Sequence, residues 1–259
     1  IFTHFGNVTI TTSELCNNVA EQGGAMYLDV SSDVTVSHDI LCANTAVSSG
    51  NTATGGAFYV NESDLNITNT VIAENTAEAD GGAIFSASTS VVDLVNNTIV
   101  GNEVTAGAGG DAALQFNDGN VDITNNIIAY SVTTQGFAHD DNVVSPSGSN
   151  NAWFSNDDGD ATGYTLVDAV TTDPLLADYT MDADCSNDTF WPDCFSPVHN
   201  AGNGAILDPD PGTGVGASAS DIGAYGGPDA GAIGIGGTDP WTVFGDADPH
   251  PFMDDCDDA

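Results

Sequence analysis

The chain has 259 residues, 38 of them Asp or Glu, and it contains no Lys or Arg, so its formal net charge is −38. Ordinary usage would supply on the order of 25 to 30 basic side chains in a chain of this length. Their absence excludes Schiff-base lysine, P-loop lysine and arginine-finger chemistry, and it argues against nucleic-acid binding, which needs cations against phosphate. Anionic membrane surfaces would repel the chain, and no window reaches the roughly 18 apolar residues of a membrane helix. Multivalent cations, Ca²⁺ above all, are the partners that such a chain favours, although acidity also suits solubility or high salt.

Gly-Gly-Ala followed by apolar or aromatic residues recurs along the first half of the chain. Copies occupy residues 23–27, 55–59 and 81–85, and a degenerate fourth occupies 109–114. The second glycines of successive copies are 32, 26 and 28 residues apart. Self-similarity at this period indicates stacked structural repeats.

Each Gly-Gly-Ala belongs to a longer unit with two earlier apolar stretches. The first alternates apolar, polar and apolar residues, which is typical of a strand, and it occurs at 8–10, 34–36, 65–67, 92–94 and 121–123. The second is an apolar patch about six residues later, at 15–16, 40–41, 71–72, 99–100 and 127–128. Most of these patches are closed by Asn, at Asn18, Asn44, Asn75 and Asn102, before a polar turn leads into Gly-Gly-Ala.

Three short strands in about 27 residues, with no helical periodicity, predict an all-β fold in which each repeat is one coil of a parallel β-helix. A β-sandwich is the alternative, but it would show hairpin turns and no positional register between units. We expect the β-helix to occupy residues 1–235, with irregular coils from about residue 131, and an acidic tail at 236–259.

The repeats resemble the right-handed parallel β-helix repeat proteins of bacterial surfaces, such as polymorphic outer-membrane and adhesin-like passenger proteins. Residues 125–129 are similar to a coil of such proteins, as are the later patterns at 196–202 and 220–228. The resemblance implies a right-handed β-helix but no particular function, because these proteins include adhesins, enzymes and structural modules. The tail around Cys256 also resembles the start of an Asp/Cys-rich metal-binding repeat.

Three groups of Asp are candidate Ca²⁺ ligands. Residues 156–160 combine oxygen ligands with a turn glycine, as in part of a Ca²⁺ loop, but lack the distal Glu of an EF-hand. Because so many uncompensated carboxylates repel one another, we expect a Ca²⁺ site, and solvated acidic loops are the alternative. The candidate ligands are Asp157, Asp158 and Asp160; Asp182, Asp184 and Asp188; and Asp254, Asp255, Asp257 and Asp258.

The five cysteines include no CxxC pair, which argues against a zinc ribbon. Cys16 and Cys42 each follow the centre of a strand by six residues, so we expect them to stack on adjacent coils as a disulfide or as two thiols. Cys185 and Cys194 flank an eight-residue loop and are expected to be bridged in an oxidising compartment. Cys256 is left free or intermolecular.

Asp93 and Asp122 fall at equivalent outward positions of neighbouring repeats. A pair of carboxylates can act as acid and base or nucleophile in a glycosidase, whereas a solvated face is the plainer interpretation. Polysaccharide lyases of this fold typically use Lys or Arg, which the chain lacks.

The chain starts without Met or a leader, so we expect it to be a segment of a longer, secreted precursor. Ile1, Phe2 and Phe5 form a short apolar start to the first coil, which predicts head-to-tail contact with another copy. We therefore expect a non-enzymatic, extracellular or cell-surface structural module that forms filaments and is stabilised by Ca²⁺. The alternative is a carbohydrate-binding or glycosidase-like β-helix that acts on extracellular polysaccharide.

Overall fold

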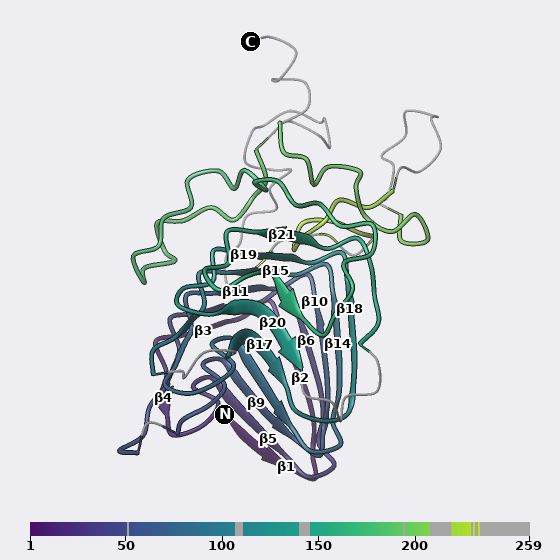
Figure 1. Cartoon of the computed structure of the whole chain (residues 1–259). Coiled ribbons are helices and arrows are strands. Elements are labelled where there is room, and N and C mark those ends of the chain that lie inside the picture. Colours follow the sequence, from purple (N-terminus) through teal and green to yellow (C-terminus); the bar gives the residue numbers. More distant parts are fainter. Residues whose placement is uncertain are drawn as a thin grey trace.

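The computed structural model describes residues 1–50, 52–106, 111–139, 146–193, 195–207, 219–228, 230 and 233. Within these residues the fold is all-β and every ladder between named strands is parallel. The chain winds as a β-solenoid of about six turns, as Figure 1 shows. No helix in the described part of the chain is long and apolar enough to cross a membrane.

Four sheets run along the solenoid, each built from one strand per coil. Sheet A consists of β1 (Phe2–His4), β5 (Met26–Asp29), β9 (Phe58–Asn61), β13 (Ile84–Ala87), β17 (Ala112–Phe116), β20 (Gln135–His139) and β22 (Ala161–Thr162). Sheet B consists of β2 (Asn7–Thr11), β6 (Asp33–Ser37), β10 (Asp64–Thr68), β14 (Val91–Val95) and β18 (Asn120–Thr124).

The other two sheets complete each coil. Sheet C consists of β3 (Glu14–Cys16), β7 (Ile40–Cys42), β11 (Val71–Ala73), β15 (Thr98–Val100), β19 (Ile127–Ala129) and β21 (Ala152–Phe154). Sheet D consists of β4 (Val19–Ala20), β8 (Thr45–Ala46), β12 (Thr76–Ala77) and β16 (Glu103–Val104). The predicted all-β parallel β-helix is therefore confirmed, with three to four strands per coil. The additional strand has two residues and lies in the polar turn before Gly-Gly-Ala.

The alternating triplets stack in register, which confirms the predicted interior ladder. Ile10, Val36, Ile67, Leu94 and Ile123 are partners on successive strands of sheet B. The four later members are buried, whereas Ile10 in the first coil is only half-buried. Apolar side chains of sheets A and C fill the same interior, in which Trp153 is the largest fully buried side chain of the described residues.

The Gly-Gly-Ala motif is explained by close approach between coils. A Cβ on Gly56 would lie 2.0 Å from the carbonyl oxygen of Gly82 on the next coil, far inside van der Waals contact. Glycine is thus required where sheets D and A meet. The copy at 109–110 lies outside the described residues.

Columns of Asn hold successive coils together. Asn44 donates its backbone N–H and its side-chain N–H to Asn75 Oδ1, each at 2.9 Å, and Asn75 donates in the same way to Asn102. These side chains are fully buried, and the ladder satisfies the polar groups of a turn that water cannot reach. The Asn that closes each apolar patch is therefore structural.

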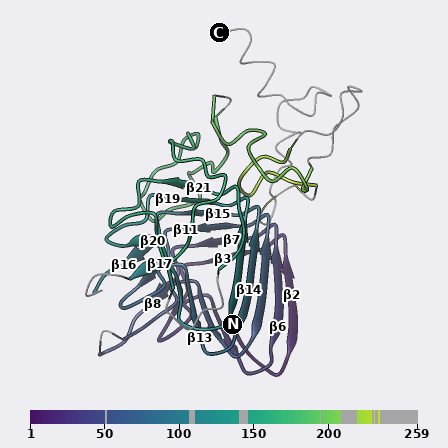
Figure 2. The ribbon, with the colours of Figure 1, turned by 45° about the vertical axis from the view of Figure 1, so that its right-hand side comes forward.

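Residues after β22 fold back along the outer face of sheet C and form a second core. Phe190, Val198 and Ile222 pack there against outward side chains of sheet C such as Val71 and Ile127. In Figures 1 and 2 these green segments lie beside β19 and β21. The irregular coils expected from about residue 131 thus include a covering layer for one face of the solenoid.

Candidate cation site and assembly surface

A segment that we call the strap, residues 173–193, runs across the turns that follow the strands of sheet C. Tyr130 donates to Asp173 at 2.7 Å, and the hydroxyl of Tyr179 lies over Gly101. Ala183 N–H donates to the carboxylate of Glu74. These contacts meet three successive coils in reverse order along the chain, so the strap fastens them together.

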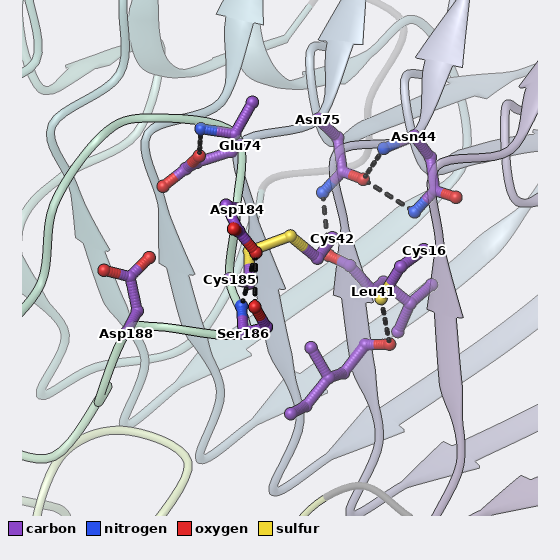
Figure 3. The surroundings of a disulfide bond; sticks show 12 residues. Cys16, Leu41, Cys42, Asn44, Glu74, Asn75, Asp184, Cys185, Ser186 and Asp188 are labelled. Carbon is purple, nitrogen blue, oxygen red and sulfur yellow. Dashed lines mark hydrogen bonds between the residues drawn. A yellow bond between two sulfur atoms is a disulfide. The ribbon is translucent and has the colours of Figure 1, made fainter.

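A disulfide joins the strap to one further coil. Cys185 is bonded to Cys42, with a Cα–Cα distance of 6.3 Å (Figure 3). This pairing overturns both predicted bridges, Cys185–Cys194 and Cys16–Cys42. Each of them needs either Cys185 or Cys42, and these two cysteines are bonded to each other. The physical reason is that the strap brings Cys185 back over the second coil, across a sequence separation of 143 residues.

The predicted stacking of Cys16 on Cys42 is confirmed, since the two residues are partners in the β3–β7 ladder. Cys16 is a free thiol whose pKa is raised by burial. Cys194 and Cys256 lie outside the described residues.

Glu74 is a buried acidic residue in a turn position that recurs once per coil, directly after each strand of sheet C. Residues directly after the sheet C strands, including Ala43, Glu74, Gly101 and Tyr130, all have positive φ, and Glu74 has φ 57°. Only 7% of its surface is exposed. Burial raises the pKa of its carboxyl to about 7, partly offset by the hydrogen bond from Ala183 and reinforced by the nearby negative charges of Asp188 and Asp182.

Asp188 faces Glu74 from the strap. Its Oδ1 accepts hydrogen bonds from the backbone N–H and hydroxyl of Thr180, at 2.8 and 2.9 Å. Glu74, Asp188 and Cys185 bring one potential ligand atom each to within 4.8 Å of one another, the one such group within the part of the chain that the structure describes. Figure 3 shows Glu74 and Asp188 beside the disulfide.

The other two Asp of this cluster bind the strap's own loop. Asp182 accepts from Asp184 N–H at 3.0 Å and from Asn187 at 3.1 Å, while Asp184 accepts from Ser186. Both are exposed. The predicted cluster therefore divides: Asp188 turns toward the solenoid, and Asp182 and Asp184 form turns at the surface.

The first predicted cluster, Asp157, Asp158 and Asp160, does not form a group of potential ligands within the described residues. Asp157 accepts from Thr133 N–H at 2.9 Å and Asp160 accepts from Asn156 at 3.0 Å, so both bind their loop to the fold. Asp158 is exposed. Asp254, Asp255, Asp257 and Asp258 lie outside the described residues.

Among the described residues, the first coil lies at one end of the stack. Its strands β1, β2, β3 and β4 are the edge strands of all four sheets. Ile1, Phe2, Phe5 and Val19 are 60, 64, 66 and 68% exposed. A depression lined by Ile1, Phe2, Val19 and Tyr27, among others, opens here. Ile1, Phe2 and Phe5, which the sequence predicts to mediate assembly, are thus exposed beside strands that are edge strands within the described part of the chain.

Asp93 and Asp122 are in register on neighbouring strands of sheet B, as their spacing predicts. Burial raises the pKa of Asp93, and the charges of Asp122 and Asp64 add to this effect. Asp122 accepts from Thr124 and Ser147 at 3.0 and 2.7 Å. The five strands of sheet B contain no aromatic residue to hold a sugar ring.

Comparison with family models, curated proteins and solved structures finds no match to this chain. Its function has to be argued from its own residues. Sequence reasoning missed Glu74 and Tyr179, because a lone Glu or Tyr gives no sign of which loop will cover it. Aligning the repeats does place Glu74 in a turn column otherwise filled by small or neutral residues.

Proposed function

We propose that the chain is an extracellular or cell-surface structural module that joins copies of itself end to end and is stabilised by Ca²⁺. The role is not enzymatic, and it agrees with the resemblance to bacterial surface β-helix proteins. The observation that carries the proposal lies in the first coil of the described residues, whose four strands are the edge strands of their sheets beside exposed apolar side chains. Such edges are templates for pairing with another chain.

The interior of the first coil supports the same proposal. Val8, Ile10 and Leu15 are only half-buried, whereas their partners on the second coil are buried. Another coil placed on this end would bury them and continue the stack. A second copy of the chain is the occupant that we propose, because its coils carry strands of the same four sheets.

The Asn ladder gives the contact a direction. Each Asn of the ladder accepts at Oδ1 from the coil before it, and Asn18 in the first coil donates to Asn44 at 2.9 Å. Asn18 is exposed, so its acceptor is available to donors on an incoming coil. At the other end of the solenoid, β22 and β21 are the last strands of sheets A and C. A head-to-tail contact between these ends propagates into a filament unless rotation closes it.

Substitution of the exposed Phe2 and Phe5 tests this proposal. The double variant Phe2→Asp and Phe5→Asp adds two buried charges to the contact, so we expect assembly to fall by at least about tenfold in association constant. Sedimentation velocity over a concentration series with millimolar Ca²⁺ measures it. Val47→Asp is the control, since Val47 is 44% exposed but lies one coil inside the stack. Equal assembly of the wild type and the double variant would contradict the proposal.

Carbohydrate binding is the second candidate, favoured by the outer face of sheet A. Phe2, Tyr27, Tyr59 and Phe85 form a column with successive ring centroids 5.4, 4.7 and 5.5 Å apart. A polar column runs beside it, in which Asp29 binds His4 and Asn61, each at 3.0 Å. Aromatic faces beside polar groups suit sugar rings. Loss of polysaccharide binding in Tyr59→Ala would support this candidate, and equal affinity would exclude it.

A further inference from the structure

Three oxygen atoms between the strap and the solenoid are buried without any hydrogen-bond partner: Glu74 Oε1, Asp188 Oδ2 and Tyr179 Oη. Unpaired buried polar atoms are rare in folded proteins and call for an explanation. The three lie together. A Cβ placed on Gly101 would be 2.2 Å from Tyr179 Oη and 3.2 Å from Glu74 Cγ. One carboxylate oxygen of Glu74 and one of Asp188 lie within 4.8 Å of each other.

The second oxygen of each carboxylate is already committed. Glu74 Oε2 accepts from Ala183 N–H, and Asp188 Oδ1 accepts twice from Thr180. Two such carboxylates facing each other out of water repel strongly, and the chain has no Lys or Arg with which to neutralise them.

We propose that a Ca²⁺ ion binds between Glu74 and Asp188 and fastens the strap to the solenoid. Glu74 Oε1 and Asp188 Oδ2 are its charged ligands, Tyr179 Oη lies beside it, and water completes the six to eight oxygens that Ca²⁺ takes. The Cys185 sulfur is bonded to Cys42 and is not a ligand. The two positive charges balance the two carboxylates.

The disulfide and the ion act on the same segment. Cys185 fixes the strap to the second coil and Ala183 fixes it to the third, so the ligands are held in place before the ion arrives. Preorganisation of this kind raises affinity because less order has to be imposed on binding. The site gives a location to the Ca²⁺ of the proposed function, and it does not depend on assembly.

Thermal unfolding under non-reducing conditions, in Ca²⁺ and in EDTA at fixed ionic strength, tests the site. We expect Ca²⁺ to raise the melting temperature of the wild type and to have little effect on Glu74→Gln or Asp188→Asn. In EDTA both variants should melt above the wild type, because each removes one of two facing charges. Glu62→Gln is the matched control. Like Glu74, Glu62 directly follows a strand and has a positive φ, so the substitution removes one negative charge from the same kind of turn. Its side chain is exposed, however, and lies outside the proposed site.

Terbium, which replaces Ca²⁺ and is excited by nearby aromatic rings, gives a second readout. We expect Tb³⁺ luminescence in the wild type and in Glu62→Gln, displaced by Ca²⁺, and at least about tenfold weaker Tb³⁺ affinity in Asp188→Asn. If Ca²⁺ stabilises all variants equally, the ion binds elsewhere and this site is wrong, although Ca²⁺ stabilisation would stand. If a shared proton fills the gap instead, Ca²⁺ and EDTA will give the wild type the same melting temperature. Sedimentation of the same samples reports separately on assembly.

Discussion

Asp39 is a fully buried carboxyl in a column whose later members are Thr70, Asn97 and Asn126. It accepts from Ser13 and Ser37 N–H at 2.6 and 3.0 Å. Burial nevertheless raises its pKa to about 6, with the two hydrogen bonds and nearby His38 opposing the shift. At neutral pH the fold therefore holds a carboxylate where the rest of the column uses neutral groups.

This charge makes stability depend on pH. The pKa is raised in the folded state, so protonation favours folding, and the stability cost of the ionised form grows as pH rises from about 4 through 6. Asp39→Asn removes the cost and offers a donor to the preceding coil, as Asn97 does to Ile67 O at 2.9 Å. We expect the free energy of unfolding of the variant to be about 2 kcal/mol higher than that of the wild type at pH 7.5. This difference should largely disappear near pH 4, where Asp39 is protonated in the folded state. Urea unfolding across this range measures it, and a variant less stable at every pH would contradict it.

At the scale of the elements, the Asn ladder shows that the contribution of an Asn side chain to stability depends on its position along the stack. Asn75 sits mid-stack and takes part in five hydrogen bonds to Asn44, Asn102 and Leu41. Asn18 makes its bonds at the exposed first coil. The same side chain should therefore matter far more in the middle than at the end.

Asn75→Ala leaves buried donors and an acceptor unpaired, and we expect it to cost roughly 3 to 5 kcal/mol, against less than about 1 kcal/mol for Asn18→Ala. Chemical denaturation of the two variants measures the difference. Equal losses would show that the ladder does not carry the stability assigned to it.

Much of the solenoid could be predicted from the sequence, because repetition makes each interior position visible several times. The ladder through Ile67 and the Asn that closes each patch are examples. Strands of two residues, such as β12, are too short to show alternation, so the sequence does not reveal the short fourth sheet. The strap could not be foreseen either: Cys185 meets Cys42 through a segment that has no repeat, and only the folded path reveals that partner.

The whole molecule combines a repetitive stack with two kinds of fastening. The strap crosses coils on one side of sheet C, and residues 221–226 cross on the other, where Asn69 donates to Ala224 O and Gly226 O at 2.9 and 2.7 Å. Within the described residues, the strap and residues 221–226 thus cover one face of the stack, and the first coil supplies an edge strand to each sheet. A net charge of −38 opposes contact between copies, so cations should promote assembly by screening this repulsion.

Electron microscopy of the purified chain at high concentration in millimolar Ca²⁺ tests the central claim most directly. The account predicts filaments that run along the solenoid axis, with strands spaced roughly 4.8 Å apart in the axial direction and fewer filaments in EDTA. Monodisperse single particles under all of these conditions, with the first coil still uncovered, would contradict it.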